Sequence, residues 1–93
     1  MPKLNYPLKT YIKVVKSIAT EKGLSSVKVT PAKGSVVRFE LFEKNMNIPM
    51  SIWVIHHTHN NKKEIWSKDD YRKAARNLGC DYLTFLEKFK TLK

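Results

Sequence analysis

The first part of the chain carries apolar residues at the spacing of an amphipathic helix. These residues recur every three or four positions, at Leu8, Tyr11, Ile12, Val15, Ile18 and Ala19. Gly23 follows where such a helix would end, because glycine readily adopts the conformation found after a last helical turn. We therefore predict a helix between Leu8 and Gly23. At about 100° per residue, the helix places one narrow stripe of lysines beside its apolar face, namely Lys9, Lys13 and Lys16.

The apolar period then changes to two, which is the period of a strand with one buried face. A turn at residues 31–34 separates a first strand, from Ser26, from a second strand that begins at Val36. The alternation turns one set of residues inward, namely Val27, Val29, Val37, Phe39 and Leu41. A third strand is predicted over residues 48–57, and Pro49 near its start indicates an edge strand or a bulge, because proline donates no hydrogen bond.

Two helices are predicted after a turn at residues 60–63. Ser67 and Asp70 have the spacing of a capping box, with Asp in place of the usual Glu or Gln, and Trp66 before them is expected to act as a hydrophobic staple. The helix that begins there ends at Gly79, and its inward face is Tyr71, Ala74, Ala75 and Leu78. Asp81 then caps a last helix, which carries Tyr82, Phe85, Leu86 and Phe89.

The elements are expected in the order α-β-β-β-α-α, which is an α+β fold with a three-stranded antiparallel sheet. With 93 residues, the chain suits one core and one domain over residues 1–93. The simplest packing covers one face of the sheet with helices and leaves the other face open to solvent or to a partner.

The charge balance points to a polyanionic partner. Lys and Arg number 18 against 8 Asp and Glu, so the formal net charge is +10, and the sequence pI is about 9.9. Up to Phe39, Glu21 is the only acidic residue. Such an excess is typical of proteins that bind phosphate backbones. The alternative is a lysine-rich surface that serves solubility alone.

The single Cys80 indicates a reducing compartment. It has no second cysteine as a disulfide partner, whereas a secreted domain of this size usually carries several, so we expect a cytoplasmic protein in which Cys80 packs as a small apolar residue. The longest apolar stretch, residues 48–55, is interrupted by Pro49 and Ser51 and falls far short of the about 20 residues of a membrane span. No membrane partner is expected.

Several short segments together resemble the HicA (YcfA-like) toxins. They are Lys33-Gly34-Ser35, Val54-Ile55-His56, Lys63-Glu64-Ile65 and the ending from Leu78-Gly79 to Phe85-Leu86. HicA toxins are small basic proteins with a double-stranded-RNA-binding-domain-like (dsRBD-like) fold, which act as ribosome-independent mRNA interferases and are neutralised by HicB antitoxins. The resemblance implies that fold, RNA as the substrate and an acidic HicB-like partner, while DNA stays open as a ligand.

The chain departs from the family at one important position. In HicA toxins the Gly-Ser turn is typically followed by the catalytic histidine, whereas here the matching residue is Val36. Valine cannot exchange a proton, so the family's nuclease activity does not carry over directly.

The three histidines of the chain cluster near the end of the third predicted strand, at His56, His57 and His59. Metal-free RNA cleavage needs a base for the 2′-hydroxyl and an acid for the leaving oxygen, and the pKa of histidine suits both roles. His56 and His57 are therefore the candidate catalytic residues, with positive charge from Lys33, Arg38 and Lys62. On a strand, His57 and His59 would share a face and His56 would point away. Alternatively, the histidines are simply polar residues at a strand end, or they face RNA without taking part in catalysis.

No metal or cofactor is expected, because the His-x-His pair lacks a second ligand pair and the three glycines form no phosphate-binding loop. Trp53 and Trp66 could stack on unpaired bases, although core packing is the commoner fate of tryptophan.

The leading hypothesis is a HicA-like, dsRBD-like protein that binds RNA mainly through the phosphate backbone. Its nucleic-acid-binding residues would be Lys9, Lys13, Lys16, Lys33, Gly34, Ser35, Arg38, His59, Lys62 and Lys63. A second hypothesis is a divergent endoribonuclease in which His56 or His57 replaces the missing histidine. A third is an interaction module whose basic surface receives an acidic protein.

Overall fold

The computed structural model describes residues 4–24, 26–58 and 63–91. Its helices are α1 (Leu8–Glu21), α2 (Lys68–Leu78) and α3 (Tyr82–Thr91), and its strands are β1 (Ser26–Pro31), β2 (Val36–Phe42) and β3 (Ser51–His56). The strands form one antiparallel sheet in the order β1-β2-β3. The predicted α+β class and the order α-β-β-β-α-α are confirmed.

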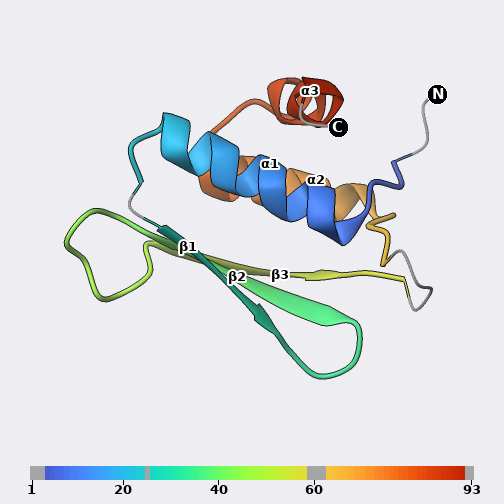
Figure 1. Ribbon diagram of the computed structural model, residues 1–93, viewed down its shortest axis with the longest axis horizontal. Helices are drawn as coiled ribbons and strands as arrows, with labels where there is room; N and C mark the ends of the chain where they lie inside the picture. Colours follow the sequence, from blue (N-terminus) through green and yellow to red (C-terminus); the bar gives the residue numbers. More distant parts are fainter. Residues whose placement is uncertain (1–3, 25, 59–62, 92–93) are drawn as a thin grey trace.

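The helices lie on one side of the sheet and leave its other face open (Figure 1). α1 packs against β1, and α2 packs against β3. α3 packs against α1 and α2 rather than against the strands, so it forms an outer layer on the side away from the sheet (Figure 1).

The core lies between the sheet and the helices and is rich in aromatic rings. Its largest fully buried side chains include Tyr11, Tyr71, Phe39, Phe85 and Phe89. The Tyr11 ring meets Phe39 of the sheet edge-on, with centroids 5.3 Å apart, and Tyr71 of α2 at 5.7 Å. The inward strand residues and the inner face of α2 are those that the periodicity predicts, because burial of apolar area is the main driving force for folding.

The third strand is shorter than predicted. β3 begins at Ser51, and Ile48 and Pro49 lie in the loop before it. Pro49 has no N–H to donate to a ladder, and the Ile48 side chain is 74% exposed instead of buried. β3 is nevertheless the edge strand that Pro49 indicated. The loop and β3 expose a run of alternate apolar residues, here called the apolar row: Met46, Ile48, Met50, Ile52 and Val54.

The entrance to α2 also differs from the prediction. Ser67 is the N-cap residue, as predicted, but its side chain makes no capping hydrogen bond. The predicted capping box does not form, because the Asp70 carboxylate accepts a hydrogen bond from the backbone N–H of His56 on β3. The hydrophobic staple is wrong as well, since Trp66 is 54% exposed while the neighbouring Ile65 is fully buried. The other two boundaries are confirmed: Gly79 ends α2 with a φ of 69°, and the Asp81 carboxylate caps α3.

Candidate nucleic-acid interface

α1 presents its lysines to solvent as one row, here called the lysine row: Lys9, Lys13 and Lys16, all exposed. We predicted this row beside the buried face, but it lies opposite to it. Val14 is fully buried, whereas Leu8 and Ile12 are only half-buried, and this rotates the buried face of α1 away from the lysines. The row therefore spans about 10 Å of the outer helix surface, at a rise of about 1.5 Å per residue.

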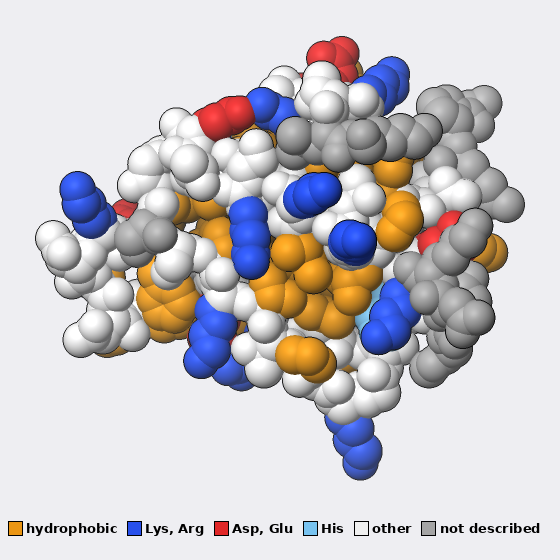
Figure 2. Space-filling view, viewed as in Figure 1, with side chains coloured by type: hydrophobic (Ala, Val, Ile, Leu, Met, Phe, Trp, Pro, Cys, Tyr) orange, Lys and Arg blue, Asp and Glu red, His pale blue; other side chains and the backbone are white. Residues whose placement is uncertain are grey.

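Among the described residues, no ion pair involves the lysine row. The ion pairs among these residues are Arg38–Glu40, Lys73–Asp70 and Lys88–Glu21. Lys and Arg side chains gather over α1 and the sheet below it, and Asp and Glu side chains lie toward the rim of this face (Figure 2). The α1 face therefore carries a concentrated positive charge.

The turn between β1 and β2 meets the histidines at the end of β3. The Lys33-Gly34-Ser35 turn is closed by a hydrogen bond from the Ala32 N–H to the Val36 carbonyl, 2.8 Å long, and Gly34 has the positive φ of 72° that favours glycine. The His57 N–H donates to the Ser35 carbonyl at 3.0 Å. The sheet register also pairs Val36 directly with His56. Two segments that lie some twenty residues apart in the sequence thus form one end of the sheet.

The two described histidines differ in their surroundings. His56 ends β3 and is exposed, and its place opposite Val36 puts its side chain on the open face of the sheet. His57 is half-buried, and its Nδ1 lies 2.7 Å from the carbonyl oxygen of Thr58. Because a carbonyl can only accept, Nδ1 carries a proton and Nε2 is the basic nitrogen of the neutral ring. β3 ends at His56, so the strand alternation that we applied to His57 does not reach it.

The other predicted binding residues lie in two places, at the start of α1 and on the open face of the sheet. Lys63 is exposed, and its carbonyl accepts the N–H of Leu8 at 2.8 Å, which places it at the start of α1 near Lys9. Arg38 lies instead on the open face of the sheet, opposite Val54, and its guanidinium pairs with Glu40 at 3.4 Å. Arg38 is therefore separate from the lysine row. His59 and Lys62 lie outside the described residues.

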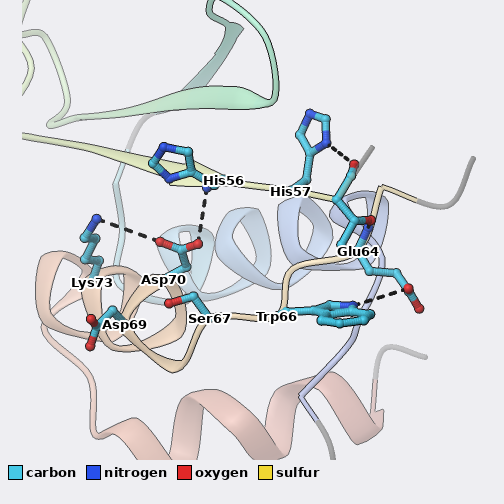
Figure 3. Close-up of a pocket in the computed structure, with 9 residues that line it drawn as sticks. His56, His57, Glu64, Trp66, Ser67, Asp69, Asp70 and Lys73 are labelled. Carbon is cyan, nitrogen blue, oxygen red and sulfur yellow. Dashed lines mark hydrogen bonds and ion pairs between the residues drawn. The ribbon is translucent and has the colours of Figure 1, made fainter. Parts of the chain in front are cut away.

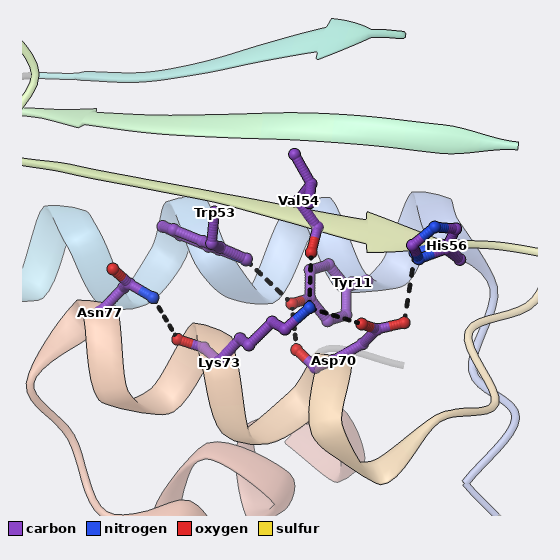
Figure 4. Close-up of polar contacts among 7 residues, drawn as sticks. All are labelled: Tyr11, Trp53, Val54, His56, Asp70, Lys73 and Asn77. Carbon is purple, nitrogen blue, oxygen red and sulfur yellow. Dashed lines mark hydrogen bonds and ion pairs between the residues drawn. The ribbon is translucent and has the colours of Figure 1, made fainter. Parts of the chain in front are cut away.

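Sequence reasoning missed a polar network that joins β3 to α2 around the buried Asp70 (Figure 4). One Asp70 oxygen accepts the His56 N–H at 3.2 Å, and the other lies 3.8 Å from the Lys73 ammonium. Lys73 also donates to the Val54 carbonyl at 3.3 Å. These α2 side chains satisfy backbone groups on the outer edge of β3, which protects an otherwise open edge strand from pairing with another chain. Burial raises the pKa of Asp70, while the His56 N–H and Lys73 oppose this rise.

Tyr11 extends this network into the core. Its hydroxyl donates to the Asp70 carbonyl at 2.7 Å and accepts the indole N–H of Trp53 at 3.3 Å. Burial raises the pKa of Tyr11 far above its ordinary value, so the hydroxyl keeps its proton for donation. Trp53 is buried and stacks on Phe39, which makes it a core residue rather than a base-stacking one.

An open pocket of about 450 Å³ lies beside this network (Figure 3). Its wall on the strand side is formed by His56, His57 and Thr58. The opposite wall comes from the segment that leads into α2 and from the first turns of that helix, with Glu64, Trp66, Ser67, Asp69, Asp70 and Lys73. Trp66, which lines this pocket, is 54% exposed.

The described residues bring together no three His, Cys, Asp or Glu side chains that could hold a metal ion. Burial raises the pKa of the Cys80 thiol, which is half-buried. No helix in the described part of the chain has the length and apolar character of a membrane span.

Comparison of the chain with protein-family models, with curated proteins and with solved structures finds no match. The resemblance to HicA toxins therefore stays a prediction that rests on the quoted residues.

Proposed function

We propose that the protein binds RNA through the lysine row, with the Lys33-Gly34-Ser35 turn as a second contact. The observation that carries the proposal is the row itself: three exposed ammonium groups on one helix face, without an acidic partner among the described residues. A net charge of +10 adds long-range attraction for a polyanion. Contacts of this kind are made to phosphates, so binding is expected to depend little on sequence.

The expected mode is recognition of the RNA backbone and its 2′-hydroxyls. A dsRBD-like protein reads duplex RNA by shape, across grooves of A-form geometry that B-form DNA does not offer. RNA is therefore the preferred ligand over DNA of the same sequence, and the resemblance to HicA toxins favours the same choice. The helix side of the sheet, with α1 in front, supplies a surface of the required charge (Figures 1 and 2).

A charge-matched pair of variants tests the proposal. The first variant replaces Lys9, Lys13 and Lys16 by Gln. The second replaces by Gln three exposed basic residues outside the row, namely Lys44, Arg76 and Lys90. Both lower the net charge by the same amount. Fluorescence anisotropy with labelled RNA and DNA duplexes measures Kd.

We expect the row variant to bind duplex RNA about 10- to 100-fold more weakly, at about 0.5–1 kcal/mol for each exposed contact. The variant with Lys44, Arg76 and Lys90 replaced should lose much less affinity for duplex RNA. Equal losses in the two variants would show that net charge alone drives binding, and the lysine row would then not be the interface.

A second candidate function, cleavage of the bound RNA, is favoured by the place of the histidines. His56 lies opposite Val36, the position at which the resemblance implies a catalytic histidine, and the His57 backbone bonds to the Ser35 carbonyl. In this proposal Nε2 of His57 takes the proton of a 2′-hydroxyl, whose oxygen attacks the adjacent phosphorus. The bond to the 5′-oxygen breaks, His56 in its charged form protonates that oxygen, and a 2′,3′-cyclic phosphate remains.

Incubation of labelled RNA with the protein in EDTA tests the cleavage proposal. Cleavage should yield cyclic-phosphate ends, and His56→Ala with His57→Ala should abolish it while Kd for RNA stays nearly unchanged. Intact RNA after prolonged incubation with the unchanged protein, under conditions where binding is saturated, would refute cleavage and leave the binding proposal standing.

Docking of an acidic protein is an alternative that the apolar row favours. Five exposed large apolar side chains in one run are unusual for a surface that contacts only solvent. A HicB-like acidic protein would place apolar residues on this row and a carboxylate near Arg38, which lies opposite Val54 on the same face. Ile48→Ser with Ile52→Ser should then weaken that complex in calorimetry without changing RNA affinity; an unchanged complex would exclude the apolar row as its interface.

A further inference from the structure

The two edges of the sheet differ in what covers them. On β3, two side chains of α2 bond to the outward backbone groups of Val54 and His56. On β1, no helix, loop or side chain among the described residues makes a hydrogen bond to the backbone of Val27 or Val29. β1 therefore keeps an open edge, whereas the β3 edge is already occupied.

The register of β1 with β2 shows which backbone groups face outward. Bonded and non-bonded pairs alternate along an antiparallel ladder, and the Ala32 N–H bonds to the Val36 carbonyl just beyond β1. It follows from this alternation that Val27 and Val29 turn their N–H and carbonyl groups away from β2. Pro31 also faces outward, but it has no N–H to offer. The open edge of β1 thus offers donors and acceptors at Val27 and Val29.

A groove lies beside the start of this edge, between β1 and the last turns of α1. Its volume is about 270 Å³, and it is lined by Lys16, Ala19, Thr20, Leu24, Ser26 and Val27. Figure 2 shows apolar side chains between α1 and β1, with Lys and Arg side chains around them. Paired residues of neighbouring strands place their side chains on the same face. Residues of an added strand that pair with Val27 and Val29 would therefore point toward α1 and this groove.

Charge selects an acidic strand for this edge. Lys28 stands between the two valines, its side chain is exposed, and the alternation of the strand places it on the open face of the sheet. No ion pair among the described residues includes Lys28 or Lys16. Glu40 lies opposite Lys28 on β2, but its carboxylate pairs with Arg38. A glutamate opposite Lys28 on an added strand would form a cross-strand ion pair.

The same charge disfavours a second copy of this chain. Each chain carries a net charge of +10, so two copies repel each other. Pairing of Val27 with Val29 of the other copy would also place the two Lys28 side chains opposite each other, and like charges in that position destabilise a sheet.

We propose that the open edge of β1 receives an extended acidic peptide as a fourth, antiparallel strand. Its side chains alternate, with apolar residues toward the groove and acidic residues toward Lys28. Backbone hydrogen bonds to Val27 and Val29 provide affinity, and the alternation provides selectivity. This site is separate from the apolar row, which lies on β3 and the loop before it, and it exists whether or not the protein binds RNA.

Two short labelled peptides test the inference: one alternates valine with glutamate, and the other alternates valine with lysine. Fluorescence anisotropy gives Kd for each peptide. We expect the glutamate peptide to bind with a Kd below about 1 mM, and at least about tenfold more tightly than the lysine peptide.

Hydrogen exchange of single amides, followed by NMR, reports strand addition directly. The N–H groups of Val27 and Val29 should exchange at least about tenfold more slowly when the glutamate peptide saturates the protein. The N–H groups of Lys28 and Thr30 face β2 in the ladder, so they serve as the internal control and should change little.

Methylation of the peptide backbone separates strand pairing from charge attraction. The valines of the peptide are the residues that pair with Val27 and Val29, so N-methylation of these valines should abolish binding. N-methylation of the glutamates should leave Kd nearly unchanged, because their N–H groups point away from β1.

Variants of the protein test the same two contributions. Val29→Pro deletes one outward N–H and should weaken binding of the glutamate peptide about 2- to 10-fold. Val29→Ala keeps that N–H and is the matched control, and circular dichroism checks that both variants fold. Lys28→Gln should weaken binding of the glutamate peptide about 1.5- to 5-fold without weakening that of the lysine peptide.

Three results would overturn the inference. Equal affinity for the glutamate peptide with and without N-methylvaline would show attraction by the lysines without strand addition. Slow exchange of Val27 and Val29 in a dimer of the protein alone would show that a second copy covers the edge. Absence of binding at about 1 mM glutamate peptide, or protection of these amides by an RNA duplex only, would exclude a peptide strand.

Discussion

Removal of the Tyr11 hydroxyl group is the sharpest test of the hydrogen bonds that join α1 to α2 and β3. Tyr11 is fully buried on α1, the helix that carries the lysine row. Its hydroxyl donates to the Asp70 carbonyl of α2 at 2.7 Å and accepts the Trp53 indole N–H of β3 at 3.3 Å. Tyr11→Phe keeps the ring and its aromatic contacts and deletes only these two bonds.

The size of the effect follows from what each partner loses. The Trp53 N–H is buried and has no other hydrogen-bond partner among the described residues. In Tyr11→Phe this buried donor is therefore left without an acceptor, which destabilises the folded state. The Asp70 carbonyl can still accept a bond from within α2, so its loss is smaller. We expect the free energy of unfolding to fall by about 1–3 kcal/mol. For a domain of this size, each kcal/mol lowers Tm by about 4–8 °C.

Urea unfolding followed by circular dichroism measures this loss. Tyr82→Phe is the matched control, because Tyr82 is half-buried on α3 and its hydroxyl has no hydrogen-bond partner among the described residues. That control should change stability by less than about 0.5 kcal/mol. A Tyr11→Phe protein that is as stable as the Tyr82→Phe protein would refute the network as a link between α1, α2 and β3.

Three further changes test the local chemistry. Burial raises the pKa of Asp70, so the folded state holds its proton more tightly than the unfolded state, and stability should fall as pH rises from the ordinary value toward the raised pKa. Asp70→Asn keeps an acceptor for the His56 N–H and should remove this dependence in urea titrations across acidic pH, whereas Asp70→Ala should cost about 1–3 kcal/mol. Gly79→Ala should cost about 1–2 kcal/mol in the same assay, from its φ of 69° alone, because an added Cβ would meet nothing within 4 Å; Gly79→Asn should cost less. Burial raises the pKa of the Cys80 thiol, so its alkylation by iodoacetamide at neutral pH should be slower than that of glutathione, and a rate equal to glutathione's would contradict its burial.

The sequence predicted the elements well because each carries a local signal. Three of these signals depend only on residues that are close in the sequence: the helical spacing from Leu8, the period of two around Phe39 and the glycine at the end of α2, Gly79. The start of β3 was wrong for a physical reason: periodicity reports that Ile48 is apolar, but not that the surrounding structure buries it. Its exposure follows from the path of the loop around Pro49, which no local pattern contains.

The site was harder to predict because it depends on tertiary partners. Asp70 has the spacing of a capping residue, yet it bonds to His56 on β3, and the sequence carries no signal for that choice. The meeting of the Ser35 turn with His57 depends on the sheet register, and a slip of one residue would move His56 to the other face of the sheet. The excess of lysines on α1 could be read directly, whereas their exact orientation depended on the burial of Val14.

The dependence of RNA affinity on salt tests the central claim most directly. Each phosphate neutralised by a lysine contributes about 0.7–0.9 to the slope of log K against log salt concentration. This slope should therefore differ by about 2–3 between the wild-type protein and the variant with Lys9, Lys13 and Lys16 replaced by Gln, when both bind the same RNA duplex. Parallel lines for the two proteins would show that the lysine row does not contact the phosphates, and would contradict the account.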